Sequence, residues 1–230
     1  MIALVGAGEF LESMRPIDAE LLRRAGGRRV ALLPTASAPD GPGVPQRWAA
    51  MGEDHFRALG ADPAAVMALD RTGCQAGEHV DLVRQADLVY FSGGKPGYLL
   101  HTLRGTPLWE AVLGVLSRGG VLAGCSAGAM ILGEWIPDHL SLRHPPFWKP
   151  AFGLVPGAMV LPHFDELPAW VGGVLWALRP RQSHLIGVDG GTALVGDADG
   201  WGILGPGRVT VRTRAGAASY AAGQAVQILE

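Results

Sequence analysis

Short, continuous runs of hydrophobic residues recur along the first two thirds of the chain, and segments with helical spacing lie between them. The hydrophobic runs are at residues 2–6, 29–34, 65–69, 87–94, 120–124 and 158–164. Apolar runs of this length are typical of strands that are buried on both faces of a sheet. The helical segments are at residues 18–26, 45–60, 97–105 and 107–120, and each ends in the glycine expected at a helix C-terminus.

The alternation of strands and helices predicts the α/β class. We expect a three-layer αβα arrangement, in which a mostly parallel sheet is flanked by helices and functional groups lie in loops at the carboxyl ends of the strands. After about residue 185 the pattern changes to short β-like runs separated by Gly and Asp, which predicts C-terminal hairpins that close one edge of the sheet. No repeat or linker divides the chain, so we expect a single domain over residues 1–230.

Composition narrows the class of protein. Hydrophobic residues make up 48% and charged residues 17% of the chain, which excludes a disordered protein. No apolar run reaches the roughly 20 residues that span a bilayer. The opening sequence "MIALVGAG" lacks the basic region and the cleavage site of a secretory signal, so we expect a cytoplasmic location.

Charge and cysteine content exclude several kinds of partner. A formal net charge of −2 argues against general binding to nucleic acid or to an anionic membrane, because both need concentrated positive charge. Small molecules or short peptides are the expected partners. Cys74 and Cys125 form no disulfide framework and lack metal-ligand spacing with the histidines, so we expect no metal and no cofactor.

The stretch "GCSAG" at residues 124–128 follows a predicted buried strand and precedes a segment that can start a helix. Strand, tight turn and helix form the context that the G-x-S-x-G nucleophile elbow requires. Ser126 has a glycine two positions away on each side, whereas Cys125 would have Ala123 and Ala127 there. We therefore expect Ser126 to be the nucleophile and Cys125 to point into the core. The alternative is a tight glycine turn with a serine that has no role.

A serine nucleophile needs a base within hydrogen-bond reach. His163 lies where the apolar run "MVLP" ends, which is a position from which α/β enzymes project catalytic groups. The other histidines lie in helical patterns, in the Pro-rich segment 137–156 or just before a strand. We expect His163 to be the base, and we expect the irregular segment 137–156 to border the site.

Four stretches, together with the spacing of "GCSAGA" and "PHF", resemble the S51 serine peptidases, which include peptidase E (aspartyl dipeptidase) and cyanophycinase. The stretches are "VALLPTAS" at 30–37, "VYFSGGKPGYLL" at 89–100, "GCSAGAMIL" at 124–132 and "GLVPGAMVLPHF" at 153–164. The later "IGVDGGTALV" at 186–195 is similar to the closing strand pair of this family. The resemblance implies a class I glutamine amidotransferase-like (flavodoxin-like) fold, with Ser126 as nucleophile and His163 as base. It also implies an oxyanion hole made of the backbone N–H groups of Gly94 and Ala127.

The chain departs from the family pattern at three places. Lys95 and Pro96 stand where many members have Asn or Gln, so Lys95 is a candidate substrate contact that differs from the family's. The arginines that follow the histidine in cyanophycinase-like sequences are absent, which argues against cyanophycin as substrate. Asp189 is followed by Gly190 instead of the glutamate that many members carry.

The acid that orients His163 has two candidates. Asp138 lies roughly where peptidase E keeps its aspartate, and Asp165 has the H-x-E-like spacing of class I amidotransferases, on the same side of a strand as His163. We favour Asp138 over Asp165. Glu134 and Glu166 are outside candidates, and we expect Glu166 near a helix N-terminus.

Three functions compete. The first is a serine exopeptidase for short peptides, the second is an amide hydrolase or amidotransferase, and the third is a non-catalytic binding module on the same scaffold. A dinucleotide-binding loop at "VGAGEF" is disfavoured, because no third glycine follows in the required register. The sequence does not determine the peptide specificity, the end that is trimmed or the oligomeric state, for which a homodimer is one possibility.

Overall fold

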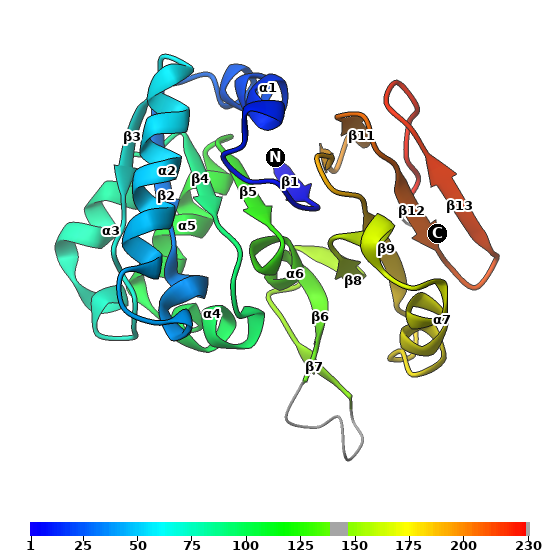
Figure 1. Ribbon diagram of the computed structural model, residues 1–230. Coiled ribbons are helices and arrows are strands. Elements are labelled where there is room, and N and C mark those ends of the chain that lie inside the picture. Colours follow the sequence, from blue (N-terminus) through cyan, green and yellow to red (C-terminus); the bar gives the residue numbers. More distant parts are fainter. Residues whose placement is uncertain (139–146, 229–230) are drawn as a thin grey trace.

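A computed structural model describes residues 1–138 and 147–228 of the chain. The protein is a mixed α/β structure with two sheets (Figure 1). The first sheet has seven strands in the order β11-β10-β1-β5-β4-β2-β3. Their bounds are β1 Ile2–Val5, β2 Arg29–Leu33, β3 Asp62–Ala65, β4 Leu88–Phe91, β5 Val121–Cys125, β10 Ala193–Asp197 and β11 Gly200–Leu204. Strands β1 to β5 are parallel to one another, whereas β10 is antiparallel to β1 and to β11.

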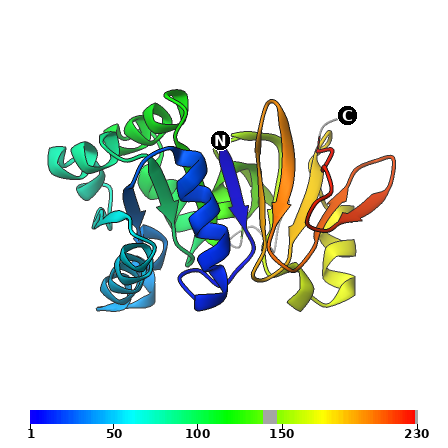
Figure 2. The ribbon, with the colours of Figure 1, turned by 90° about the horizontal axis from the view of Figure 1, so that it is seen from above.

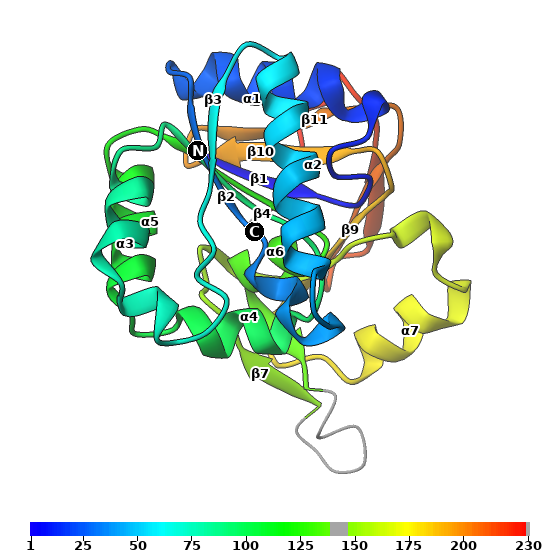
Figure 3. The ribbon, with the colours of Figure 1, turned by 60° about the vertical axis from the view of Figure 1, so that its left-hand side comes forward.

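Helices cover both faces of this sheet (Figures 1 and 3). One face packs against α1 (Arg15–Ala25) and α2 (Val44–Ala58). The other face packs against α3 (Gly77–Arg84), α4 (Pro96–Leu103), α5 (Pro107–Ser117) and α6 (Ala127–Leu132). Short 3-10 turns lie at Glu12–Met14, Thr35–Asp40 and Gly73–Gln75. Because side chains alternate along a strand, Ala3 and Val5 pack on the face that α1 and α2 cover. Ile2 and Leu4 pack on the opposite face, which α3 to α6 cover.

The second sheet has six strands in the order β13-β12-β9-β8-β6-β7. Their bounds are β6 Gly133–Pro137, β7 Trp148–Pro150, β8 Val155–Leu161, β9 His184–Val188, β12 Val209–Arg212 and β13 Ala217–Tyr220. A 3-10 turn, η4 (Phe164–Glu166), and helix α7 (Ala169–Ala177) follow β8. One face of this sheet shares the core that contains α6, and the other packs against Leu175 and Trp176 of α7.

The two sheets come together at the loops that follow β1 and β9, and β1 lies near the middle of the molecule in Figure 2. The loop after β1 packs on the loop after β9, since the Gly191 N–H donates to the Ala7 carbonyl at 3.1 Å. Any side chain on Gly6 would overlap the carbonyl groups of Val188 and Asp189 at the end of β9. The carboxyl ends of strands from both sheets therefore lie next to one another.

The α/β class and the helix positions agree with the sequence, but the expected single sheet is wrong. The strands divide into two sheets, and the C-terminal hairpins β10–β11 and β12–β13 close edges of different sheets. The expected strand pair within residues 186–195 does not form, because β9 and β10 belong to separate sheets. None of the helices in the described part of the chain is long and apolar enough to cross a membrane.

Two local expectations also need correction. The apolar run 65–69 is not a strand: β3 ends at Ala65, while Val66 and Ala68 are buried in the core beneath α3 and α5. The helix after the elbow ends at Leu132, and residues 133–137 form β6. For the first of these, burial is the reason, because a short apolar run shows that a segment is buried without fixing its secondary structure.

Candidate functional site

Ser126 lies between β5 and α6 in a backbone conformation that is rare for a residue other than glycine. Its φ is 51° and its ψ is −112°. Its N–H donates to the Val5 carbonyl at 3.0 Å, and its carbonyl accepts from the Met130 N–H at 3.0 Å. Strained residues of this kind persist only where the surroundings hold them, and they concentrate at functional sites. The half-buried Ser126 side chain is therefore presented at the carboxyl end of the central strand β5.

The glycines on either side of Ser126 are required by close packing. A Cβ atom on Gly124 would overlap the Gly128 carbonyl, and one on Gly128 would lie 2.6 Å from the Phe91 carbonyl oxygen of β4. Both glycines of the G-x-S-x-G pattern are therefore required for steric reasons. The atoms that enforce this requirement belong to the turn and to the neighbouring strand, not to Ser126 itself.

Cys125 faces away from Ser126, into the core beneath α1 and α2. Its side chain is fully buried, and its Sγ donates to Glu9 Oε2 at 3.0 Å. Burial raises the pKa of the Cys125 thiol well above its usual range, and the Glu9 carboxylate raises it further. The thiolate is the nucleophilic form of cysteine, so Cys125 is chemically inert at neutral pH.

The loop after β4 packs directly against the elbow. A Cβ atom on Gly93 would lie 3.4 Å from the Ser126 Cβ. Gly94 has a φ of 139°, and any side chain there would overlap the Ala36 carbonyl, so only glycine fits. Among the described residues, no acceptor takes the N–H of Gly94 or of Ala127, the first residue of α6. Two N–H groups next to Ser126 are thus available to a ligand.

Lys95 caps the start of α4 and turns its side chain toward a neighbouring carboxylate. Its N–H donates to the Ala36 carbonyl at 2.8 Å, and its Nζ lies 3.3 Å from Asp40 Oδ1. The Lys95 side chain is 63% exposed. Lys95 is therefore accessible to a substrate that binds beside the loop after β4.

His163 follows β8 and begins the η4 turn with a left-handed backbone, φ 51° and ψ 37°. Its Nδ1 lies 3.4 Å from Glu166 Oε2, and its side chain is 41% exposed. Within the described ranges, no hydrogen bond joins its ring to Ser126. His163 lies beyond the carboxyl end of β8 in the second sheet, whereas Ser126 lies at the carboxyl end of β5 in the first sheet.

Asp165 holds a loop together and does not lie on a strand. It belongs to the η4 turn, and its Oδ1 accepts from the Gly190 N–H at 2.8 Å. Gly190 is in the loop after β9, next to Ala7. The expectation that Asp165 shares one side of a strand with His163 is wrong, because the strand ends at Leu161. Asp165 instead ties the His163 turn to the junction between the sheets.

Asp138 lies at the end of β6, not directly after the elbow helix. Its N–H donates to the Phe147 carbonyl at 2.8 Å, and its Oδ1 lies 3.9 Å from Lys149 Nζ. Glu134, on the same strand, accepts from the Gly157 N–H at 2.6 Å. The residues 139–146 of the Pro-rich segment, including His139 and His144, lie outside the described residues.

His55 and His184 are the other buried histidines among the described residues, and each lies within the packed interior. His55 Nε2 lies 2.8 Å from Asp18 Oδ2, with both side chains buried. His184 begins β9 in the core, and burial lowers its pKa, while Glu134 opposes that shift. Within residues 1–138 and 147–228, no three His, Cys, Asp or Glu side chains gather to hold a metal ion.

Glu9 is the functional-site residue that the sequence interpretation missed. It lies in the loop after β1, is only 8% exposed, and touches both the elbow and the β4 loop. The signal was present in "VGAGEF", where an acidic residue stands in a glycine loop after a buried strand. As a sequence motif, this loop suggests only a weak dinucleotide-binding pattern.

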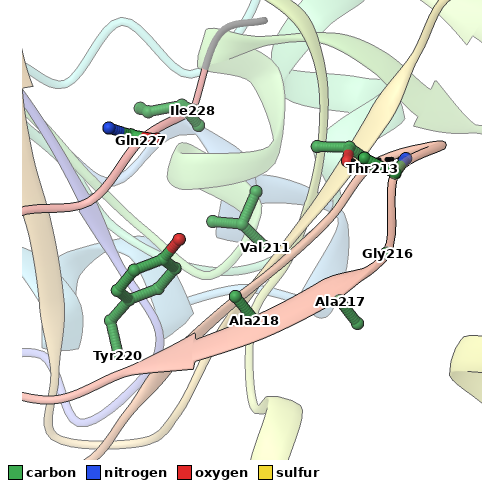
Figure 4. A pocket seen from close by; sticks show the side chains of 9 residues that line it. Val211, Thr213, Gly216, Ala217, Ala218, Tyr220, Gln227 and Ile228 are labelled. Atoms are coloured by element: carbon green, nitrogen blue, oxygen red, sulfur yellow. Dashed lines mark hydrogen bonds between the residues drawn. The ribbon is translucent and has the colours of Figure 1, made fainter.

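A hollow of about 250 Å³ lies elsewhere, along the β12–β13 hairpin (Figure 4). Its lining includes Val211, Tyr220 and Ile228, and it contains no Ser, His, Asp or Glu side chain. It offers neither a base nor a serine nucleophile. The elbow is the candidate active site because of the strained backbone of Ser126 and the close packing of its two glycines.

Comparison with known proteins identifies the family of the chain. The model of peptidase family S51 matches residues 2–201. The crystal structure of a peptidase from an acI-B1 Actinobacterium is similar, with a TM-score of 0.88 and 32% identity over 98% of this chain and 95% of that one. A putative peptidase E protein from Listeria monocytogenes EGD-e shares the fold, with a TM-score of 0.67 and 20% identity over 89% of this chain and 97% of that one. No curated protein gives a significant match. The chain belongs to peptidase family S51.

Proposed function

We propose that the protein is a serine exopeptidase that hydrolyses short peptides through an acyl-enzyme on Ser126, as in peptidase E. The observation that carries the proposal is the strained backbone of Ser126, at φ 51° and ψ −112°, between two glycines that accept no side chain. This geometry presents the hydroxyl at the end of β5, where a peptide carbonyl can reach it.

In the proposed reaction, Ser126 Oγ attacks the carbonyl carbon of the scissile bond while His163 takes the hydroxyl proton. The tetrahedral intermediate then expels the amine, which leaves with the proton that His163 held. A water molecule, deprotonated by His163, then attacks the acyl carbon, the bond from that carbon to Ser126 Oγ breaks, and His163 returns the proton to Oγ as the carboxylic acid product departs. No metal or cofactor is needed for any of these steps.

The negative charge on the intermediate needs hydrogen-bond donors that are already in place. The Gly94 and Ala127 N–H groups meet this need, because both are next to Ser126 and no described acceptor takes them. Ala127 also starts α6, so its N–H has no partner within the helix. We assign the oxyanion hole to these two groups.

Three carboxylates compete for the role of orienting His163. Glu166 is the one in direct contact, with Oε2 at 3.4 Å from Nδ1. Asp165 accepts from Gly190, and Asp138 lies near Lys149. We therefore propose Glu166 as the orienting acid, with Asp138 and Asp165 as the alternatives that substitution separates.

The surroundings of the site favour short substrates. The exposed Lys95 ammonium at the β4 loop can attract a carboxylate of the peptide. An amidotransferase is disfavoured, because that class uses a cysteine at the elbow and Cys125 is buried on the opposite side. We propose a short peptide as the only partner required for the reaction, and a homodimer remains a prediction.

A screen of di- and tripeptides, including Asp-X sequences, tests the proposal when product masses are measured. We expect release of an N-terminal or C-terminal residue by the wild-type protein and no release by Ser126→Ala. Cleavage only after an N-terminal Asp would define a peptidase E equivalent. Binding of peptides without any cleavage would instead establish the non-catalytic binding module.

A further inference from the structure

The buried Glu9 carboxylate joins the two loops that flank the proposed nucleophile. Its Oε1 accepts from the Gly93 N–H at 2.8 Å, and its Oε2 accepts from Cys125 Sγ at 3.0 Å. The strand order β1-β5-β4 places β5 between the other two strands. The Glu9 side chain, which leaves the loop after β1, therefore reaches past the end of β5 to the loop after β4.

We propose that Glu9 is a positioning residue that holds the Gly93–Gly94 segment against Ser126 and so directs the Gly94 N–H toward the reacting carbonyl oxygen. This inference rests on the proposed peptidase function. It assigns to Glu9 no contact with the substrate and no proton transfer.

The hydrogen bonds of the β4 loop carry the proposal. The Gly93 N–H is held by Glu9, and the Lys95 N–H is held by the Ala36 carbonyl at 2.8 Å. Gly94 lies between these two anchored neighbours, and its own N–H has no acceptor among the described residues. Fixing both neighbours fixes the direction of the Gly94 N–H.

The second oxygen of Glu9 fixes the same loop relative to the elbow. Cys125 precedes Ser126 in the chain, so the Cys125 contact ties Glu9 to the backbone that carries the nucleophile. A Cβ atom on Gly93 would lie 2.6 Å from Glu9 Oε1 and 3.4 Å from Ser126 Cβ. The carboxylate, the β4 loop and the serine are thus packed with no space between them.

Burial of a carboxylate is costly unless its oxygens are hydrogen-bonded. Glu9 is 8% exposed, and each of its oxygens has a donor. An apolar side chain would fill the same space, but it would leave the Gly93 N–H without an acceptor and free to rotate. At position 9, a side chain as long as Glu that carries a hydrogen-bond acceptor is therefore more important than a negative charge.

Two conservative substitutions separate length from charge. Glu9→Gln keeps the length and an oxygen for the Gly93 N–H, and its NH₂ group can face the thiol. Glu9→Asp keeps the charge but is one methylene shorter, so it cannot reach both donors. We expect Glu9→Gln to keep kcat within about fivefold of wild type, because one neutral hydrogen bond replaces a charged one. We expect Glu9→Asp to lower kcat about a hundredfold, as when an oxyanion-hole donor is lost, with little change in KM.

Binding of inhibitors gives a readout that a merely structural role would not change. A peptide phosphonate mimics the charged intermediate, so its inactivation rate should fall in Glu9→Asp by the same factor as kcat/KM. Binding of an uncleaved peptide, measured in a Ser126→Ala background, should not change. Asp18→Asn is the matched control: it alters another buried carboxylate, which contacts His55 and, among the described residues, has no hydrogen bond to the β4 loop.

The outcomes separate this inference from the proposed function. Wild-type turnover together with an unchanged kcat in a folded Glu9→Asp variant, or a larger loss in Glu9→Gln than in Glu9→Asp, would overturn the role of Glu9 alone. Wild-type protein that cleaves no peptide would overturn the proposed function. In that case the amide NMR signals of Gly93 and Gly94 decide: a shift of both in Glu9→Asp supports the holding role, and unchanged signals overturn it.

Discussion

Gly124 and Gly128 face one another across the elbow so closely that the carbonyl of Gly128 occupies the space of a Cβ atom on Gly124. A Cβ atom on Gly124 would also lie 2.7 Å from the Ala129 nitrogen. We expect Gly124→Ala to lower the free energy of unfolding by about 3 kcal/mol, at the upper end of overpacking costs, because backbone atoms must move. Urea unfolding measures this change.

The control is Gly114→Ala on α5, where the nearest atom to a Cβ is the far end of Arg118 at 3.8 Å. Replacement of a glycine inside a helix by alanine should raise stability by up to about 1 kcal/mol. Equal stability of the Gly124→Ala and Gly114→Ala variants would mean that the elbow is looser than described.

A phosphonate probe for serine hydrolases should label Ser126 and leave Cys125 unlabelled. The Ser126 hydroxyl is half-buried at the end of β5, whereas the Cys125 thiol is fully buried and its pKa is raised by burial. Intact mass followed by peptide mapping locates the label. A label on Cys125, or near wild-type activity in Ser126→Ala, would contradict the assignment of the nucleophile.

His163→Ala should lower kcat at least about a hundredfold, which is the low end of what a positioned general base contributes. The fold should survive, since the side chain is 41% exposed. His184→Ala is the control for loss of a histidine, and it should affect turnover little because His184 is buried at the start of β9. Equal losses of activity in the two variants would show that His163 is not the base.

Three single substitutions rank the carboxylates around His163. We expect Glu166→Gln to lower kcat about tenfold, well below the effect of removing a buried triad acid, because its contact with His163 is solvent-exposed. Asp165→Asn keeps an oxygen for the Gly190 N–H and should be nearly silent. Steady-state kinetics on one peptide compares them with Asp138→Asn. A larger loss in Asp138→Asn would restore Asp138 as the acid.

Acid should destabilise the protein in part through His184. Burial lowers the pKa of His184 in the folded protein below its usual value. As the pH falls below about 6.5, the unfolded chain takes up a proton that the folded chain resists, so stability present above this pH is lost below it. We expect His184→Gln to flatten the decline between pH 7 and pH 5, measured by thermal unfolding. Parallel pH profiles for wild type and variant would exclude this contribution.

The sequence predicts the strands and helices better than it predicts how the strands assemble. The parallel core β1-β5-β4-β2 follows from continuous apolar runs, since such runs occur where both faces are covered. The division into two sheets has no comparable signal. It depends on close contacts such as that of Gly6 with the end of β9, which involve residues far apart in the chain.

The site shows the same division between local and distant features. Ser126 and its glycines form one local pattern, so they could be identified from spacing alone. The partners of side chains depend on tertiary structure: Asp165 bonds to Gly190, and Glu9 bonds to Gly93. Neither pairing is visible in the order of residues. The sequence alone therefore predicts neither the acid that contacts His163 nor the hydrogen bonds of Glu9.

The pairing of β1 with β10 has a consequence for synthesis of the protein. β1 precedes β10 by almost 190 residues in the chain, yet one of its edges is paired only when residues 193–197 have been added. The loop after β1, which carries Glu9, also rests on the loop after β9. During translation, Ser126 and His163 are both added before these contacts can form. The residues of the candidate site can therefore take up their final arrangement only after β10 has been added to the growing chain.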